Sequence, residues 1–284
     1  MQVGFAGMGI MGVPMSLNIL KAGHGLAVYN RNPEKCAPVV DSGAQHAGTP
    51  EELARGAEVL VLMLTGPEAV DAVLFGELGA AGALGPGKTV VNMSSVGPEY
   101  SRDLAERVRA TGAGFVDAPV AGSRKPAEDG ALVILAGGEP MDLDRVEPLL
   151  LCMGKKVVRC GEAGAGSAMK MANNILLGTM VAGMAQLMRF GGAGGLDRRT
   201  LLDVVLNGPM SCMLFQLKEP LFESEEFAAQ FPLKHVAKDL RFAREAAQGY
   251  GLDAGFLDAV LGLYQRAEDQ GLGEEDFAAV YKMF

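Results

Sequence analysis

Seven short apolar runs recur through the first 160 residues of the chain and then stop. They occupy residues 2–6, 26–30, 58–64, 88–93, 114–119, 132–136 and 156–160. Each run is apolar on both faces, which is typical of strands in a parallel sheet that helices cover on both sides. Helical patterns lie between the runs, for example at 12–24 and 98–112, each with a glycine at or near its end. The alternation predicts a doubly wound α/β domain.

Beyond residues 161–166 the strand pattern gives way to helical periodicity. Residues 167–190 hold no proline and predict a helix of roughly six turns or more with a weak polar face. Five methionines along it are expected to fill the core: Met169, Met171, Met180, Met184 and Met188. The segments that follow are also helical in period, so we expect an all-α second domain joined to the first by a long interdomain helix. The predicted domains are residues 1–163 and 164–284.

The charge balance limits the classes of partner. The chain of 284 residues carries 25 Lys and Arg against 34 Asp and Glu, a formal net charge of −9, and 49% of its residues are hydrophobic. An acidic chain with a sizeable apolar core disfavours a nucleic acid or an anionic membrane surface as the main partner. The longer apolar stretches, including the one at the N-terminus, are interrupted, so we expect neither export nor a membrane span. A cytoplasmic location is the resulting expectation.

The spacing of cysteines and histidines argues against a metal centre. The cysteines show no C-x-x-C pattern and are expected to be free thiols in a reducing compartment, with disulfides as the alternative. They are Cys36, Cys152, Cys160 and Cys212. The histidines are scattered, with no H-x-x-x-H pattern: His24, His46 and His235. We therefore expect no metal and no Cys/His nucleophile, and we expect His235 on the surface of a helix.

The stretch GFAGMGIMG at residues 4–12 contains the pattern G-x-G-x-x-G as Gly7, Gly9 and Gly12. With 39 glycines in the chain the pattern alone is weak, but it follows an apolar run and opens a helical segment. Gly7 can then make the tight turn, Gly9 can let the backbone approach a pyrophosphate at the helix N-terminus, and Gly12 can allow close helix packing. We predict a Rossmann-like dinucleotide-binding domain, and the alternative is a glycine-rich turn that binds nothing. The residues between the glycines complete the expected cofactor loop: Met8, Ile10 and Met11.

The end of the second apolar run indicates which dinucleotide binds. An Asp or Glu about 20 residues beyond the glycines would bind the 2′-hydroxyl of NAD, and this chain has Asn30 there. Asn30 does not repel a 2′-phosphate, Arg31 offers it a planar fork, and Lys35 adds a second positive charge. These residues predict a preference for NADP(H), with NAD(H) still usable. The alternative is that Arg31 is an ordinary solvated arginine.

Lys170 and Asn174 are the polar residues that stand out in the predicted interdomain helix. They are four residues apart near its start, hence on one face and one turn from each other. A lysine in so apolar a helix is hard to explain as core, because burying an unpaired ammonium is costly. Both side chains could face a reaction cleft. The alternative is that Lys170 extends to solvent from an exposed first turn.

Five stretches resemble, in order and spacing, the signatures of a known family. They are residues 4–24, NMSSVGP at 92–98, residues 117–138, GEAGAGSAMKMANN at 161–174, and residues 231–243. Together they resemble the β-hydroxyacid dehydrogenases, which include 3-hydroxyisobutyrate dehydrogenase and tartronate semialdehyde reductase. Residues 117–130 and the Asn-Arg pair after the second apolar run are most similar to the glyoxylate and succinic semialdehyde reductases, also described as γ-hydroxybutyrate dehydrogenases. The resemblance covers the whole chain.

The resemblance implies roles for individual residues. Lys170 matches the catalytic lysine of the family, and Asn174 matches the amide beside it. The residues implied near the adenosine ribose of the cofactor are Leu64 and Thr65, and those implied near its nicotinamide end are Ser95 and Lys238. Besides Lys170 and Asn174, the residues implied to bind or cover the substrate are Gly122, Ser123, Phe231 and Asp239.

One departure from the family pattern affects the substrate loop. The pattern D-A-P-V-S-G-G reads D-A-P-V-A-G-S here, with Ala121 in place of the serine and Ser123 in place of the last glycine. Which hydroxyl or amide of the loop grips a substrate carboxylate is therefore open. Arg124 and Lys125 follow, either as further anion contacts or as surface charges.

The combined expectation is an NADPH-dependent reductase of a short aldehyde that carries a carboxylate, succinic semialdehyde or glyoxylate. The Lys170 ammonium would stabilise the charge that grows on the carbonyl oxygen during hydride transfer and would supply the proton. The alternatives are a 3-hydroxyisobutyrate or tartronate semialdehyde enzyme, an imine reductase or 6-phosphogluconate-like dehydrogenase on the same scaffold, and a dinucleotide-binding scaffold without catalysis. The apolar interdomain helix suggests a homodimer or homotetramer.

Overall fold

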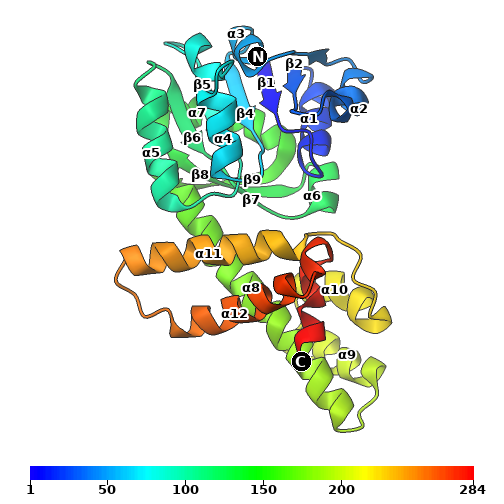
Figure 1. The fold of residues 1–284 in the computed structure, drawn as a ribbon. Coiled ribbons are helices and arrows are strands. Elements are labelled where there is room, and N and C mark those ends of the chain that lie inside the picture. Colours follow the sequence, from blue (N-terminus) through cyan, green and yellow to red (C-terminus); the bar gives the residue numbers. More distant parts are fainter. The chain divides into compact units, whose positions relative to one another are not determined.

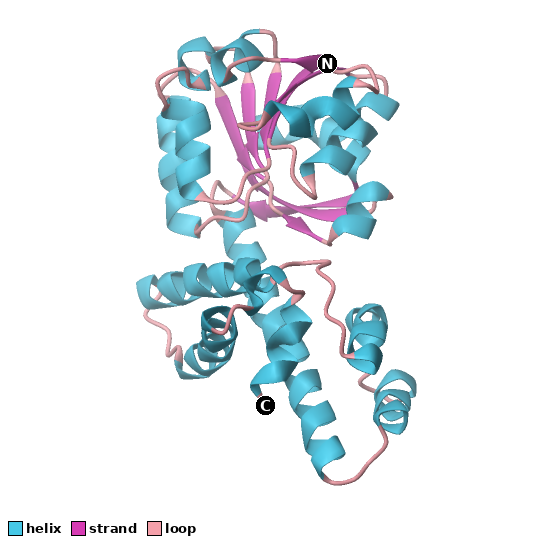
Figure 2. Cartoon of the chain, turned by 45° about the vertical axis from the view of Figure 1, so that its right-hand side comes forward, coloured by secondary structure: helices cyan, strands magenta, loops and turns pink.

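The computed structural model describes residues 1–284 (Figure 1). The chain divides into two compact units, Met1–Lys170 and Met171–Phe284. The division falls inside helix α8 (Ala165–Ala193), a few residues beyond the boundary expected after residue 163. Every β-strand belongs to the first unit, and the second unit is built from helices (Figure 2). The expected fold class, a Rossmann-like α/β domain followed by an all-α domain, is confirmed.

The first unit holds a nine-stranded sheet in the order β3-β2-β1-β4-β5-β6-β8-β7, with β9 paired to β8. The strands are β1 (Gln2–Ala6), β2 (Gly25–Tyr29), β3 (Gln45–His46), β4 (Val59–Leu62), β5 (Thr89–Asn92), β6 (Gly114–Asp117), β7 (Val120–Ala121), β8 (Leu132–Gly138) and β9 (Gly154–Gly161). All seven expected strands form. The additional strands β3 and β7 have two residues each, which is too short for a period to be detected.

The sheet is not parallel throughout. The pairs that join β1 to β6 are parallel, whereas β8 runs antiparallel to both β6 and β7. The expectation of a parallel sheet is therefore wrong for β8 and for β9, which pairs parallel to β8. Between β6 and β8 the chain contains only β7 and the short helix α6 (Arg124–Glu128), and this segment lacks the longer crossover helix that a parallel return needs.

Helices cover both faces of the sheet. Besides α6 they are α1 (Gly12–Lys21), α2 (Ala37–Val40), α3 (Pro50–Arg55), α4 (Pro67–Phe75), α5 (Pro98–Arg109) and α7 (Pro140–Met153), with 3₁₀ turns η1 (Pro33–Cys36) and η2 (Ala80–Ala83). Val59 and Val61 of β4 lie in the core layer of α1 and α7. Leu60 and Leu62 lie in the layer of α3, α4 and α5. Successive residues of β4 thus enter opposite layers, as a doubly covered sheet requires.

The second unit packs its helices around one core. After α8 come α9 (Arg198–Asn207), α10 (Met213–Ser224), α11 (Leu233–Gly249), α12 (Gly255–Asp269), η3 (Leu272–Glu274) and η4 (Phe277–Met283). Met171, Met184 and Met188 are buried in this core and Met180 packs against it, as expected. Met169 is 45% exposed, so the expectation of core filling is wrong at this position.

Helix α8 is long and apolar enough to cross a membrane if only length and composition are considered. One such helix is weak evidence, because the central helix of a soluble protein meets the same criterion. Here α8 supplies Val181, Met184 and Ala185 to the core of the second unit, and packing of this kind accounts for its apolar composition.

Candidate active site

The parallel strands of the first unit end in register at one edge of the sheet. Tyr29, Ala6, Leu62, Asn92 and Asp117 are successive register partners, and they close β2, β1, β4, β5 and β6. Ligands of open α/β sheets bind outside the carboxyl ends of the strands. The loop residues expected at the cofactor leave these strand ends, so the fold gathers them at the binding edge.

The glycine loop has the shape that a dinucleotide needs. Gly7 has a φ of +109°, and a Cβ there would lie 2.2 Å from the Met63 carbonyl oxygen. A Cβ at Gly12 would lie 1.8 Å from the Gly7 carbonyl oxygen, whereas a Cβ at Gly9 would meet nothing within 4 Å. The tight positions shape the turn, and the open one leaves room for a pyrophosphate at the N-terminus of α1. The residues present therefore fit a dinucleotide.

Asn30 holds the glycine loop in place. Its Oδ1 accepts a hydrogen bond from Met8 N at 3.0 Å, and its Nδ2 donates to the Asn32 carbonyl oxygen at 2.9 Å. The Met8 side chain is buried, Met11 is half-buried, and Ile10 is 54% exposed. The side-chain amide of Asn30 is thus engaged inside the protein, an arrangement that the sequence did not indicate.

Arg31 and Lys35 can offer positive charge beside the end of β2. Both are exposed, and neither side chain makes a hydrogen bond or ion pair within the protein. Between them Asn32 caps η1, because its Oδ1 accepts a hydrogen bond from Glu34 N at 3.1 Å. The cap fixes the backbone that carries the two cations.

Ser94 ties the end of β4 to the end of β5. Its hydroxyl accepts a hydrogen bond from Leu64 N at 2.9 Å, and its own N–H donates to Asn92 Oδ1 at 3.2 Å. Leu64 and Ser95 are half-buried, and Thr65 is exposed. Sequence reasoning singled out Ser95 and missed Ser94, whose only signal was its place in the NMSSVGP stretch.

The expected substrate loop turns sharply after β7. Gly122 has a φ of +136°, and a Cβ there would lie 2.7 Å from Leu132 Cδ2, so glycine is required at this position. Gly122 is exposed and Ser123 is half-buried. The turn directs the chain from β7 into α6.

The two cations after this loop pair within their own helix. Arg124 Nε lies 2.8 Å from Glu128 Oε1, and Lys125 Nζ lies 2.6 Å from Asp129 Oδ1. Hydrogen bonding to Asp129 raises the pKa of Lys125. These i,i+4 pairs favour the alternative in which both residues are surface charges, and their spacing was visible in the sequence.

Lys170 lies near the start of α8 and is only 6% exposed. Helix α8 follows β9, whose Gly161 is the register partner of Gly137 in β8, and Gly137 in turn is the partner of Asp117. The helix therefore starts beside the end of β6, at the binding edge. Burial of this degree disagrees with the alternative in which Lys170 extends to solvent.

In the second unit a hydrogen bond joins Asn174 to Asp239. Asn174 is fully buried, and its Nδ2 donates to Asp239 Oδ2 at 2.6 Å. Asp239 Oδ1 accepts no hydrogen bond, although Lys238 Nζ lies 3.4 Å from it as an ion pair. The carboxylate therefore orients the amide of Asn174 and retains accepting capacity on its other oxygen.

Phe231 precedes α11 and stacks on His235, with ring centroids 6.3 Å apart. His235 lies on α11, as expected, and is half-buried. Burial lowers the pKa of His235, and the positive charge of Lys238 lowers it further. The backbone N–H of Phe231 donates to Asp276 Oδ2 at 3.0 Å, which fixes the segment before the helix.

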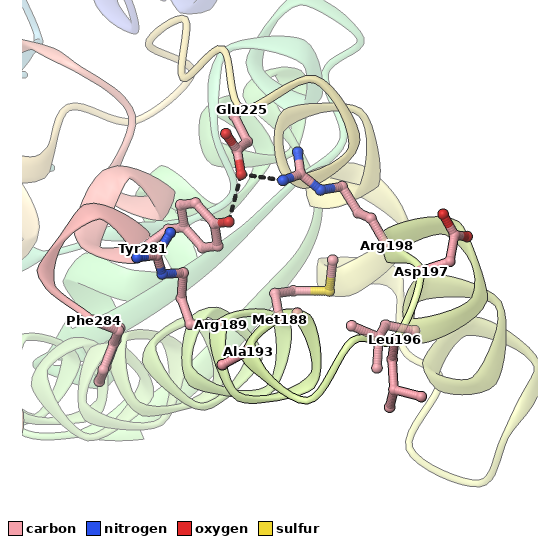
Figure 3. A pocket seen from close by; sticks show the side chains of 11 residues that line it. Met188, Arg189, Ala193, Leu196, Asp197, Arg198, Glu225, Tyr281 and Phe284 are labelled. Atoms are coloured by element: carbon pink, nitrogen blue, oxygen red, sulfur yellow. Dashed lines mark hydrogen bonds and ion pairs between the residues drawn. The ribbon is translucent and has the colours of Figure 1, made fainter.

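A separate cavity of about 600 Å³ lies in the second unit beside the end of α8 (Figure 3). Arg198 and the Tyr281 hydroxyl both donate to the Glu225 carboxylate, and the Arg189 guanidinium lies 5.2 Å from the centroid of the Tyr281 ring. None of the residues expected to bind cofactor or substrate lines this cavity. It is therefore distinct from the candidate active site.

The features of the first unit define a class of protein. An open glycine turn at a helix N-terminus, on the carboxyl edge of a parallel sheet, binds a dinucleotide. A buried lysine near the same edge can stabilise an oxyanion and supply a proton. These are the features of a dinucleotide-binding enzyme with a helical second domain.

Comparison with known proteins gives the same class. Residues 2–161 match the family model of the NAD binding domain of 6-phosphogluconate dehydrogenase. Residues 164–284 match the model described as the NAD-binding part of NADP-dependent 3-hydroxyisobutyrate dehydrogenase.

Curated relatives and a solved structure align over nearly the whole chain. In Arabidopsis thaliana, glyoxylate/succinic semialdehyde reductase 2 (chloroplastic) is 38% identical over 98% of this chain and 78% of its own length. The A. thaliana glyoxylate/succinic semialdehyde reductase 1 is 35% identical over 99% of this chain and 97% of its own. The crystal structure of 3-hydroxyisobutyrate dehydrogenase from Salmonella typhimurium has a TM-score of 0.91 at 26% identity, and the alignment covers 100% of this chain and 99% of that one.

The chain belongs to the β-hydroxyacid dehydrogenase family, which confirms the resemblance carried by its five motifs. It is an NAD(P)-dependent enzyme of the hydroxyacid dehydrogenase type, with a nicotinamide dinucleotide as cofactor and a small molecule as substrate.

Proposed function

We propose that the protein uses NADPH to reduce a short aldehyde bearing a carboxylate, succinic semialdehyde or glyoxylate, and that Lys170 donates the proton. The observation that carries this proposal is the burial of Lys170 at the start of α8. A buried amine at the edge of the sheet where a dinucleotide is expected supports a role in the reaction rather than in contact with solvent. The names of the two A. thaliana relatives support the choice of substrates.

The bound nicotinamide supplies the hydride for the aldehyde carbon. The Lys170 ammonium hydrogen-bonds to the aldehyde oxygen, stabilises the negative charge that grows there and transfers a proton to it. Asn174 lies one turn further along α8, and its Nδ2 is committed to Asp239. Its Oδ1 accepts a hydrogen bond from Asn173 Nδ2 at 3.3 Å and retains a second lone pair that can orient the ammonium of Lys170.

We assign the substrate carboxylate to the backbone N–H groups of Gly122 and Ser123 and to the Ser123 hydroxyl. The left-handed glycine brings the exposed backbone of the loop to the surface. Arg124 and Lys125 are weaker candidates, because each already pairs with a carboxylate of α6. Phe231 and Asp239 are assigned to the substrate from the family resemblance.

We propose NADPH as the preferred cofactor because Arg31 and Lys35 are exposed and free of internal partners. A 2′-phosphate gives the guanidinium a partner that NADH lacks. The remaining cofactor contacts are assigned from the glycine loop and the family resemblance: Gly7, Met8, Gly9, Ile10, Met11, Gly12, Asn30, Leu64, Thr65, Ser95 and Lys238.

The proposal is tested by replacing Lys170 with alanine. Loss of a general acid should lower kcat by about a hundredfold to ten-thousandfold, while NADPH binding, followed by fluorescence titration, should stay within about twofold of wild type. Lys156→Ala is the matched control, because Lys156 is an exposed lysine of β9. A wild-type kcat in Lys170→Ala would remove the proposed mechanism.

The substrate is tested with a panel of four aldehydes and NADPH: succinic semialdehyde, glyoxylate, methylmalonate semialdehyde and tartronate semialdehyde. We expect the highest kcat/KM for one of the first two. Methylmalonate semialdehyde is the oxidised partner of 3-hydroxyisobutyrate, and the similarity to 3-hydroxyisobutyrate dehydrogenase from S. typhimurium makes that enzyme the second candidate. A higher kcat/KM for methylmalonate semialdehyde would favour the second candidate, and a higher kcat/KM for tartronate semialdehyde would favour a tartronate semialdehyde reductase.

We also infer that the protein forms a homodimer or homotetramer. The apolar helix α8 exposes Met169, Leu176 and Phe190, and a second copy of the chain would cover such side chains. Size-exclusion chromatography with light scattering tests this inference. A monomer at micromolar concentration would contradict it.

A further inference from the structure

Asp117 is a fully buried carboxylate for which no basic side chain provides an ion pair. It is the last residue of β6, at the binding edge of the first unit, and it is 0% exposed. Burial raises the pKa of Asp117, whereas hydrogen bonds from backbone N–H groups oppose that rise. A buried carboxylate is costly unless such bonds compensate for lost water. The N–H groups that donate to this carboxylate therefore indicate its role.

Those partners belong to the start of α8. Gly164 N donates to Asp117 Oδ1 at 2.9 Å, and Ser167 N donates to Asp117 Oδ2 at 2.7 Å. The first N–H groups of a helix have no partner within the helix, and a side-chain oxygen of the N-cap residue usually accepts one of them. Helix α8 begins at Ala165, and the residue before it is Gly164, which has no side chain. The carboxylate of Asp117, at the end of β6, therefore caps α8 in place of an N-cap side chain.

Glycines let the helix start come close enough for this cap. A Cβ at Gly166 would lie 2.3 Å from the Leu135 carbonyl oxygen. A Cβ at Gly137 would lie 2.5 Å from Asp117 Oδ1 and 2.9 Å from Gly166 N. No larger residue fits at either position without displacing backbone. The first turn of α8 is therefore seated on the ends of β6 and β8 with little freedom to shift.

We propose that Asp117 is a positioning residue for Lys170, an inference that rests on the proposed function of that lysine. Lys170 lies three residues beyond Ser167, about 4.5 Å along the helix axis. A helix transmits a shift of its first turn to the next turn, and a displacement of about 1 Å at a reacting group can cost about a hundredfold in rate. Asp117 also starts the segment that reaches Gly122 five residues later. Asp117, at the end of β6, thus helps to fix the position of the Lys170 ammonium and the position of the substrate loop.

The carboxylate of Asp117 also affects the electrostatic environment of Lys170. A helix N-terminus carries a partial positive charge, which disfavours a cation in the first turns. The carboxylate lies against that terminus and offsets it. An asparagine at this position would retain one accepting oxygen and lose the charge. Asp117→Asn therefore keeps one of the two capping hydrogen bonds and removes the other.

The experiment compares Asp117→Asn with a variant in which a different carboxylate that is hydrogen-bonded to β6 is replaced. Asp142 Oδ2 accepts a hydrogen bond from Phe115 N at 3.3 Å, far from α8 in the sequence, and Asp142→Asn is the matched control. In Asp117→Asn we expect kcat to fall about tenfold to a hundredfold, with the NADPH dissociation constant unchanged in a fluorescence titration. Amide exchange without cofactor should accelerate at Ser167 and the residues that follow it. Asp142→Asn should keep the wild-type kcat.

A wild-type kcat in Asp117→Asn would overturn the proposal. A fall in kcat no larger than the fall in the fraction of enzyme that binds NADPH would also overturn it, because the active molecules would then be unaffected. Lys170→Ala in the same series reports on the proposed function separately. If Lys170→Ala is inactive while Asp117→Asn is fully active, only the positioning role fails, whereas full activity of Lys170→Ala removes the function itself. Should Asp117→Asn not fold, the unaltered enzyme still decides, because exchange of the Ser167 amide at the unprotected rate would exclude the cap.

Discussion

Replacement of Arg31 by alanine isolates the contribution of one guanidinium to cofactor choice. The side chain is exposed and has no partner inside the protein, so its loss leaves no carboxylate unpaired. Asn30 beside it is held by Met8 and Asn32, which keeps the shape of the surrounding loop. The substitution should therefore change the binding of a 2′-phosphate and little else.

The expected magnitude follows from the kind of bond that is lost. A hydrogen bond to a charged group contributes about 1.5–3 kcal/mol. Because Arg31 is exposed, water and salt screen its charge, and the lower end of that range applies. Since about 1.4 kcal/mol corresponds to tenfold, the preference for NADPH over NADH should fall about tenfold. A bidentate contact would extend the loss toward about a hundredfold.

The assay compares kcat/KM for NADPH and for NADH at a saturating concentration of the aldehyde. Arg55→Ala is the matched control, because Arg55 is also exposed in the first unit and pairs with Glu51 on α3. We expect the NADPH value to fall only in Arg31→Ala, with the NADH value and the unfolding midpoint unchanged. An unchanged ratio of the two cofactors, or an equal change in Arg55→Ala, would refute direct contact between Arg31 and a phosphate.

Substitutions at three further sites test other parts of the structure. Gly9→Val should leave the unfolding free energy within about 1 kcal/mol, because the new side chain enters open space, but should abolish NADPH binding; retained binding would contradict the assigned pyrophosphate position. Lys218 Nζ lies 2.8 Å from both oxygens of buried Asp276, so Lys218→Met should cost about 3–5 kcal/mol in urea unfolding. The double variant Lys218→Met/Asp276→Asn should recover part of this loss, and no recovery would mean that an unpaired charge is not the cause. Because burial lowers the pKa of His235 below its ordinary 6.5, protonation opposes folding and stability should fall as the pH drops through that value. His235→Gln should weaken that dependence in thermal unfolding, and an identical dependence would contradict the assignment.

The sequence predicted the elements well because strand and helix preferences depend on neighbouring residues. β1 forms over Gln2–Ala6, the residues of the first apolar run, and α5 (Pro98–Arg109) ends a few residues before Gly112. The glycine spacing likewise predicted a loop whose tight and open positions the structure contains. Each of these patterns lies within about a dozen consecutive residues, a range over which side-chain periodicity is informative.

The supporting residues of the candidate site could not be predicted in this way. Asp117 accepts hydrogen bonds from Gly164 and Ser167, which are 47 and 50 positions away. Ser94 binds Leu64 across 30 positions. Backbone N–H groups carry no sequence signature, so their partners become apparent only when the segments are placed beside one another.

The sequence by itself determined an α/β domain followed by helices, a glycine turn suited to a dinucleotide, the family, and the candidate residues Arg31 and Lys170. Tertiary structure decided the reversed direction of β8, the engagement of Asn30 with the glycine loop, the burial of His235 and the cap that Asp117 places on α8. The physical reason is the range of the interactions. Periodicity and turn preference act between residues close in the chain, whereas burial and hydrogen-bond partners depend on segments that meet only after the chain has folded.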